Sequence, residues 1–317
     1  MASVRHVFGP VASRRLGRSL GVDLVPYKTC TYDCIYCQLG RTTRKTLERS
    51  DYVPLEDVLS ELDRKIAEGP PPDYVTLSGS GEPTLHSRLG EVVAGVKERT
   101  TIPLAILTNG SLLGNPEVRR DLRQADVVIP SLDAGSEPLF RYVNRPHCDL
   151  RLKGVAEGLV RFREEFAGSI WLEVFLLGGV TALEAEVRQI AEIAGQCNPD
   201  RIHLNTVSRP PAEDYAMPVP PERMRALAAL FGDRAEVISP QPLAPAAESR
   251  EDRSEDVLAI LRRRPCTIAD LSRALALAPS QAVKCVEHLI SRGIAVNTRW
   301  AGGERYLSVP GPREARP

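Results

Sequence analysis

Short apolar runs alternate with longer helical patterns along most of this chain. The predicted strands are rich in β-branched residues and bounded by turn formers, and they span residues 21–25, 74–78, 104–108, 127–131, 170–176 and 201–206. Apolar residues at helical spacing lie between or after them, over residues 55–67, 183–194 and 221–230. Because parallel strands need crossover connections, this order predicts an α/β fold with helices outside a parallel sheet. Six units are fewer than a closed eight-unit barrel needs, so we expect a partial (β/α)6 TIM-like barrel that binds ligands at the carboxyl ends of its strands.

The composition changes where this alternation stops. Three prolines lie within residues 239–247, and proline resists both helix and sheet. We therefore divide the chain into a barrel domain over residues 1–238, a linker over residues 239–253, and a small domain over residues 254–317.

The small domain has the pattern of three short helices followed by a hairpin. The first helix is predicted over residues 254–263, and Thr267 with Asp270 forms a capping-box-like start for the second. Ser280 is expected to cap the third helix, and residues 295–309 are typical of a hairpin. This order resembles a winged-helix domain. Its modest basic charge favours a substrate-presenting or protein-binding role over recognition of duplex DNA.

Charge is unevenly distributed, although 41 basic and 41 acidic side chains cancel over the 317 residues. Residues 1–50 hold nine Lys/Arg against three Asp/Glu, and residues 250–317 hold twelve against eight. Basic ends indicate an anionic ligand or partner at each end, or else solvated surface charge. No apolar run approaches the ~20 residues of a membrane span, and residues 1–10 lack a signal-peptide core, so we expect a cytoplasmic protein with no membrane partner.

Three of the seven cysteines, Cys30, Cys34 and Cys37, lie within eight residues directly after the first predicted strand. A structural zinc site needs four ligands, and no fourth Cys or His lies nearby in the sequence. A disulfide is disfavoured in a reducing cytoplasm. An iron–sulfur cluster held by three thiolates would keep one iron open for another ligand. Cys148 is a candidate fourth ligand or a hydrogen-atom donor, whereas Cys197, Cys266 and Cys285 have the pattern of buried apolar residues.

The spacing Cys-x3-Cys-x2-Cys, with Tyr36 just before the third cysteine, resembles the signature of the radical S-adenosylmethionine (SAM) superfamily. The resemblance implies that Cys30, Cys34 and Cys37 bind a 4Fe-4S cluster whose fourth iron is chelated by SAM. It also implies an enzyme that accepts one electron from a partner such as flavodoxin or ferredoxin, cleaves SAM to a 5′-deoxyadenosyl radical and abstracts hydrogen from a substrate. The protein itself would bind, orient and shield the reactants.

Further motifs follow successive predicted strands. Ser80-Gly81-Glu82-Pro83 resembles the superfamily's Gly-Gly-Glu-Pro element, which contacts the SAM amino group. The resemblance implies SAM carboxylate and ribose contacts near Asn109, Ser131 and Asp133, and adenine contacts near Gly178-Gly179 and Asn205. Taken singly, these motifs also fit a glycine-rich turn, Asx turns or helix caps.

Residues 10–17, 36–42 and 204–211 resemble uncharacterised relatives of the wyosine-base-forming radical SAM proteins. The wyosine enzymes bind a second cluster through additional upstream cysteines, and this sequence has no cysteine before Cys30. The resemblance therefore implies an enzyme that modifies RNA. It does not imply the reaction of the wyosine enzymes, which condense pyruvate onto a tRNA guanine. A peptide- or protein-modifying radical SAM enzyme, and an iron–sulfur redox sensor that binds nucleic acid, are the alternatives.

Two charged loops in the later part of the barrel supply candidate substrate contacts. Arg145 lies in the first loop, and Arg209 and Tyr215 lie in the second. Loops of this kind carry binding residues as often as they carry surface charge, so both readings stay open. His203 falls within a predicted strand and is expected to be a core histidine.

Overall fold

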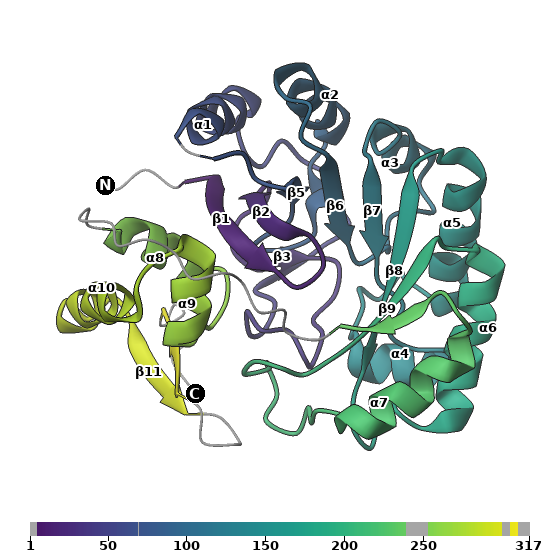
Figure 1. Ribbon diagram of the computed structural model, residues 1–317. Helices are drawn as coiled ribbons and strands as arrows, with labels where there is room; N and C mark the ends of the chain where they lie inside the picture. The colour runs from purple at the N-terminus through teal and green to yellow at the C-terminus, as the bar shows by residue number, and fades with distance from the viewer. Residues whose placement is uncertain (1–4, 69, 239–252, 300–304, 310–317) are drawn as a thin grey trace.

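The computed structural model describes residues 5–68, 70–238, 253–299 and 305–309, and it places an eight-stranded sheet at the centre of the molecule (Figure 1). The strand order is β1-β2-β5-β6-β7-β8-β9-β10. The strands are β1 (Val7–Ser13), β2 (Gly17–Val22), β5 (Tyr74–Leu77), β6 (Leu104–Thr108), β7 (Val127–Pro130), β8 (Ser169–Leu176), β9 (Arg201–Thr206) and β10 (Ala235–Val237). From β2 onward neighbouring strands are parallel, whereas β1 is antiparallel to β2.

Helices cover the outer face of this curved sheet (Figure 1). They are α1 (Leu55–Ala67), α2 (Leu89–Arg99), α3 (Pro116–Asp121), α4 (Glu137–Val143), α5 (Leu152–Glu165), α6 (Glu184–Cys197) and α7 (Pro221–Ala228), with 3-10 turns η1 (Pro83–Leu85) and η2 (Ala229–Phe231). The α/β partial barrel predicted from the alternation is confirmed. No helix within the described ranges is both long and apolar enough to cross a membrane.

The first edge of the sheet differs from the prediction. The strand expected over residues 21–25 is β2, which begins and ends earlier because it pairs along its length with β1. Gly9 and Pro10 lie inside β1, and both residues disfavour a strand pattern. The pairing register shifts between Phe8 and Val11, so a local irregularity accommodates the proline.

Side chains alternate between the two faces of β8 and show how the barrel is filled. Leu172 and Val174 belong to the large core under the helices. Trp171 instead packs inside the barrel with Leu16 and Ile129. The next inward positions on β8 are Glu173 and Phe175, which line a cavity. The barrel interior is therefore apolar at one level and opens into a partly charged cavity above it.

The C-terminal residues form the expected helices and hairpin around a core of their own. The elements are α8 (Ser254–Leu261), α9 (Ile268–Leu275), α10 (Pro279–Ser291), β11 (Val296–Arg299) and β12 (Arg305–Ser308). The Thr267–Asp270 capping box is present. The expected cap Ser280 is wrong: α10 starts at Pro279, whose fixed φ suits the first helical position. The first helix ends at Leu261 rather than 263. The winged-helix assignment stays a prediction, and residues 239–252 of the predicted linker lie outside the described residues.

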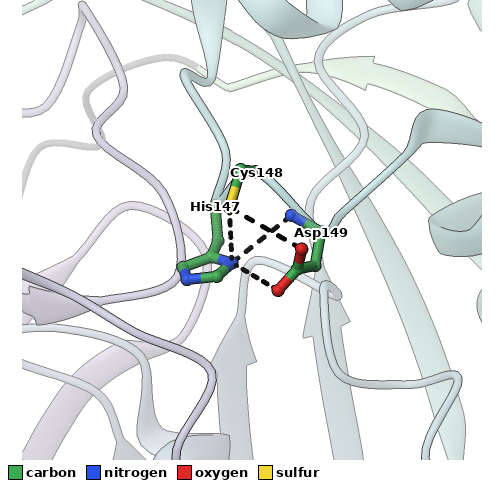
Figure 2. A group of neighbouring side chains, drawn as sticks. All are labelled: His147, Cys148 and Asp149. Atoms are coloured by element: carbon green, nitrogen blue, oxygen red, sulfur yellow. Dashed lines mark hydrogen bonds and ion pairs between the residues drawn. The ribbon is translucent and has the colours of Figure 1, made fainter.

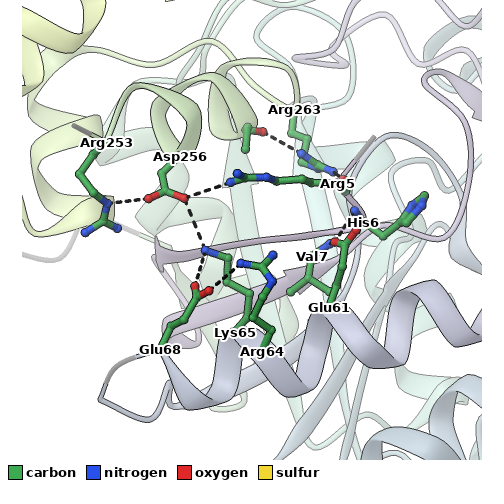
Figure 3. Close-up of polar contacts among 11 residues, drawn as sticks. Arg5, His6, Val7, Glu61, Arg64, Lys65, Glu68, Arg253, Asp256 and Arg263 are labelled. Carbon is green, nitrogen blue, oxygen red and sulfur yellow. Dashed lines mark hydrogen bonds and ion pairs between the residues drawn. The ribbon is translucent and has the colours of Figure 1, made fainter. Parts of the chain in front are cut away.

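The C-terminal domain packs against the β1 edge of the open sheet and contacts the segment after β9. Helices α8 and α9 contact β1 at one edge. On the other side, the Tyr306 hydroxyl donates to the Ser208 carbonyl, at 3.1 Å, in the segment that follows β9. Figure 3 shows ion pairs that Asp256 of α8 makes with Arg5 and with Lys65 of α1, at 3.7 and 3.5 Å. The domain thus spans the gap where a closed barrel would have further strands.

Candidate active site

The three clustered cysteines lie on one anchored loop. Cys30 ends the short strand β3 (Thr29–Cys30), which pairs with β4 (Arg44–Lys45), and Cys34 and Cys37 follow it. Backbone bonds tie this loop to the end of α4: the Ile35 N–H donates to the Val143 carbonyl at 2.9 Å. Ile35 itself is fully buried. The loop is therefore held by main-chain contacts on both sides of Cys34.

Each of the three sulfurs has a nitrogen donor from a different part of the chain. Asn109 Nδ2 lies 3.5 Å from Cys30 Sγ, and Asn144 Nδ2 lies 3.5 Å from Cys34 Sγ. Lys28 Nζ lies 3.1 Å from Cys37 Sγ. Donors of this kind stabilise thiolates and, in iron–sulfur proteins, tune the cluster's reduction potential. Asn144 and Lys28 were not among the predicted site residues.

The protonation of Cys30 and Cys34 is set chiefly by burial. Burial, with the nearby Glu82 carboxylate adding to the effect, raises the pKa of Cys30 to about 12. Burial also raises the pKa of Cys34, with Asp133 adding to the effect. Metal binding requires the thiolate, so metal binding at these buried thiols releases protons. The buried donor set fits a group that brings its own positive charge, as iron does.

Cys148 follows His147, whose N–H donates to the Thr31 carbonyl of the cysteine loop at 2.9 Å. In the part of the chain that the structure describes, its sulfur contacts the two flanking residues: His147 Nδ1 at 3.8 Å and Asp149 Oδ1 at 3.7 Å (Figure 2). These three consecutive side chains offer ligand atoms within 4.8 Å of one another. Cys148 is exposed, whereas Cys30, Cys34 and Cys37 are half-buried. The contacts therefore group Cys148 with its own neighbours rather than with the clustered cysteines.

The loop 80–83 is bound directly to the cysteine-bearing segment. The Lys28 N–H donates to the Ser80 carbonyl at 2.7 Å, and the Glu82 N–H donates to the Thr29 carbonyl at 3.1 Å. A Cβ atom added to Gly81 would lie 1.8 Å from the Thr29 carbonyl oxygen. Only glycine allows this approach. The close approach at Gly81 is therefore to the protein's own backbone, a packing role that the sequence did not indicate.

Glu82 is only 2% exposed, and its carboxylate organises the ends of two strands. Oε1 accepts from the hydroxyls of Thr84 and Thr108, both at 2.6 Å, and Oε2 accepts from the Asn109 N–H at 2.7 Å. Burial raises the pKa of Glu82. Because Oε2 has this one donor among the residues that the structure describes, it keeps acceptor capacity for a cationic ligand group.

The Ser80 side chain contacts Asp23, and Pro83 is buried. The Ser80 hydroxyl donates to Asp23 Oδ2 at 2.5 Å, and its N–H donates to Asp23 Oδ1 at 3.0 Å. Asp23 Oδ2 also accepts from Arg263 Nε of the C-terminal domain, at 3.1 Å. Pro83 is buried at the start of η1. Ser80 thus links the C-terminal domain to the loop that carries Glu82.

Asp133 is a second buried carboxylate, and its contacts are with the protein. It accepts from the Tyr36 hydroxyl, from Asn144 Nδ2 at 2.7 Å and from the Phe175 N–H at 3.1 Å. The Tyr36 ring stacks on Phe175 with centroids 4.0 Å apart. Burial raises the pKa of Asp133 to about 6. Asp133 therefore orients Tyr36 and also Asn144, the donor to Cys34.

A cavity of about 380 Å³ opens beside Cys37 and reaches the C-terminal domain. Of the predicted SAM contacts, Tyr36, Gly81 and Asn205 line it. Asn205 Nδ2 donates to Glu173 Oε1 at 3.0 Å inside the barrel. The other predicted contacts, which do not line this cavity within the described residues, are Ser80, Glu82, Pro83, Asn109, Ser131 and Asp133.

The three candidate substrate residues separate into two places. Arg145 donates to the Tyr215 hydroxyl at 2.7 Å and to Glu213 Oε1 at 2.5 Å, which ties two loops together. Neither Arg145 nor Tyr215 lines the cavity in the described structure, whereas Arg209 does. His203 is 1% exposed and packs edge-on to Trp171, as expected of a core histidine.

Comparisons with known proteins agree with this geometry. The model of the family described as the radical SAM superfamily matches residues 24–186. A UPF0026 protein of Methanocaldococcus jannaschii is 39% identical over 228 residues, which cover 71% of each chain. This chain belongs to the radical SAM superfamily, whose cofactors are a 4Fe-4S cluster and SAM. Within it, the uncharacterised UPF0026 proteins are its relatives.

Two further matches differ in how much they cover. A protein of Brachyspira hyodysenteriae named GTPase Obg is 35% identical over 292 residues, which are 91% of this chain but 43% of that relative. This chain thus spans less than half of that relative's length. A radical SAM methyltransferase from Sphaerobacter thermophilus superposes with a TM-score of 0.54 at 18% identity, covering 69% of this chain and 65% of that one. It shares the fold.

Proposed function

We propose that this chain is a radical SAM enzyme that modifies RNA. Cys30, Cys34 and Cys37 hold the 4Fe-4S cluster, and Glu82 Oε2 receives the SAM ammonium group. The observation that carries the proposal is the set of three half-buried cysteines, whose sulfurs each have their own nitrogen donor, together with the cavity that Cys37 lines.

When bound, the cluster and SAM would supply one-electron reductive cleavage of the SAM sulfur–C5′ bond, giving methionine and a radical able to abstract one hydrogen atom from the substrate. The chain's own residues bind the cofactors and shield the reacting atoms from water. Asn109, Asn144 and Lys28 direct N–H groups at the sulfurs. The stacked Tyr36 and Phe175 rings form a rigid apolar wall of the cavity, which excludes water from the reacting atoms.

The electron comes from a one-electron reductant, which we propose is a flavodoxin or a ferredoxin. Two observations support RNA as the substrate. One is the resemblance to relatives of the wyosine-base-forming proteins. The other is the arginine-rich lining of the cavity, which suits a phosphate-bearing molecule. Other residues proposed as SAM contacts are Tyr36, Ser80, Gly81, Pro83, Asn109, Ser131, Asp133 and Asn205.

The test is anaerobic reconstitution with iron and sulfide, followed by incubation with dithionite and SAM. We expect 5′-deoxyadenosine to form, measured by liquid chromatography. A protein that holds a full cluster and forms none would refute the enzyme assignment. RNA and proteins captured from the source cells with the reconstituted protein are then analysed by mass spectrometry; enrichment of peptides without RNA would redirect the substrate to protein.

A further inference from the structure

The cavity beside Cys37 has an unusual charge. Five of its lining residues are arginines, and its lining carboxylate is Glu173. The arginines come from three parts of the chain: the turn between β1 and β2, the segment after β9, and the end of α8. They are Arg14, Arg15, Arg209, Arg263 and Arg264. This positive end of the cavity lies where the barrel meets the C-terminal domain.

Three of the five arginines have a carboxylate partner. Arg15 pairs with Glu173. Arg263 pairs with Asp23 at 3.1 Å, and Arg209 lies 3.8 Å from Asp270. Asp270 is shared, because Arg273 on α9 also pairs with it, at 3.0 Å.

Arg14 and Arg264 differ from these three. Neither side chain has an ion pair or hydrogen bond with any other residue that the structure describes. Both lie near Arg209: the charges of Arg209 and Arg264 lower the pKa of Arg14, and the charge of Arg264 lowers the pKa of Arg209. The cavity therefore holds two more positive charges than the partner carboxylates neutralise.

Burial makes this excess positive charge energetically unfavourable. Burial, with the neighbouring Arg209 and Arg15 adding to the effect, lowers the pKa of Arg14 to about 10. Burial also lowers the pKa of Arg209, with Arg264 adding to the effect. The Nε atom of Arg209 is buried without a hydrogen-bond partner among the described residues. Like charges held together away from water are stable when an anion binds between them.

We infer that Arg14, Arg209 and Arg264 bind a phosphate group of the RNA substrate at the junction of barrel and C-terminal domain. The inference rests on the proposed function. Guanidinium groups match phosphate oxygens in geometry and form paired, charge-assisted hydrogen bonds with them. Because Tyr36 and Cys37 line the same cavity, a nucleotide whose phosphate lies on the arginines has its base or ribose on the side of the cysteines. The C-terminal domain would then supply part of the substrate site through Arg264.

The test measures binding to the reconstituted holoprotein under anaerobic conditions, without turnover. Inorganic phosphate is titrated by calorimetry, and a short single-stranded RNA of mixed sequence is then competed with phosphate. In the double variant Arg14→Gln/Arg264→Gln, we expect phosphate affinity to fall at least about tenfold. In the wild type, phosphate should displace the RNA, and RNA binding should weaken as salt rises.

Arg262→Gln is the matched control. It removes the same charge from the same segment, but Arg262 is exposed and does not line the cavity. We expect it to leave phosphate affinity unchanged. The double variant Arg14→Lys/Arg264→Lys keeps both positive charges and should bind phosphate more tightly than Arg14→Gln/Arg264→Gln does. This comparison separates loss of charge from misfolding.

Three results would overturn the inference. They are an equal loss in the Arg262→Gln variant, a loss of SAM affinity that parallels the loss of phosphate affinity, and phosphate binding that does not compete with RNA. The second result would assign the arginines to the SAM carboxylate. Phosphate binding that persists in a protein forming no 5′-deoxyadenosine would refute the proposed function and leave the arginine site standing.

Discussion

The cysteine site and the arginine-lined end of the cavity differ in how far the chain satisfies its own polar groups. At the cysteine site, each sulfur has a nitrogen donor, and both buried carboxylates, Glu82 and Asp133, accept several hydrogen bonds. At the arginine end, two guanidinium groups have no partner among the described residues, and a third keeps a buried nitrogen without an acceptor. The polar groups of the cysteine site, which we propose holds the resident cofactors, are satisfied by contacts within the protein. The arginine end keeps uncompensated positive charge, as expected of a site that binds an anion only transiently.

The largest expected effect tests the cysteine end directly. Replacing Cys30, Cys34 or Cys37 with serine removes a thiolate ligand, and we expect loss of the cluster's visible absorbance after reconstitution together with loss of 5′-deoxyadenosine formation. Cys148→Ser is the control, since Cys148 contacts its own neighbours. If Cys148→Ser loses the cluster as fully as Cys34→Ser does, four protein thiolates hold it and the open-iron assignment is wrong.

Gly81→Ala tests whether the loop that carries Glu82 depends on its close approach to Thr29. The added Cβ would lie 1.8 Å from the Thr29 carbonyl oxygen, so the loop must move away from the cysteines. We expect a loss of more than about 3 kcal/mol in the free energy of unfolding, measured by urea titration, and weaker SAM binding.

Gly154→Ala is its control. Gly154 lies in α5, and a Cβ there meets nothing within 4 Å. The same change at this position should stabilise the protein by about 0.5–1 kcal/mol. A Gly81→Ala variant as stable as wild type would show that the loop is free to shift.

Asp23→Ala tests the ion pair that joins the two regions. Asp23 and Arg263 are 7% and 10% exposed, so removing the carboxylate leaves a buried guanidinium unpaired. We expect a cost of about 3 kcal/mol in the free energy of unfolding by urea titration. The double variant Asp23→Ala/Arg263→Met should cost less than the sum of the two single changes. Strict additivity would mean that the pair contributes no coupling.

Asn144→Ala is the smallest of the four changes. It removes one donor to Cys34 and one donor to Asp133 while leaving all three thiols in place. Loss of such a supporting contact lowers metal affinity by about tenfold or more. Iron retention against a chelator, followed by absorbance, measures the effect. The Asn115→Ala variant, which loses a helix cap of α3 away from the site, should retain iron like wild type.

The sequence patterns predict the barrel because its parallel strands are buried on both faces and therefore appear as uninterrupted apolar runs. Strand β1 was missed because Gly9 and Pro10 interrupt its pattern. The proposed cysteine ligands are recognisable from the sequence because they lie close together on one loop. Their donors are not, since Asn144 meets Cys34 across 110 residues of sequence.

The arginine-lined end of the cavity is even harder to predict from the sequence. Arg14 and Arg264 are 250 positions apart, and nothing in either local sequence signals that they share a cavity. The basic ends of the chain favour an anionic ligand or partner at each end, and that stays a prediction. The fold adds that Arg14 and Arg264, one from each basic end, line the same cavity.

The contact between Arg263 and Asp23 also bears on how the chain unfolds. Asp23 holds Ser80, and Ser80 belongs to the loop bonded to Lys28 and Thr29. Detaching the C-terminal helices removes Arg263 from this series of contacts and leaves Asp23 bonded to Ser80. The ion pair thus couples the stability of the two domains, and we expect them to melt together in a single cooperative transition.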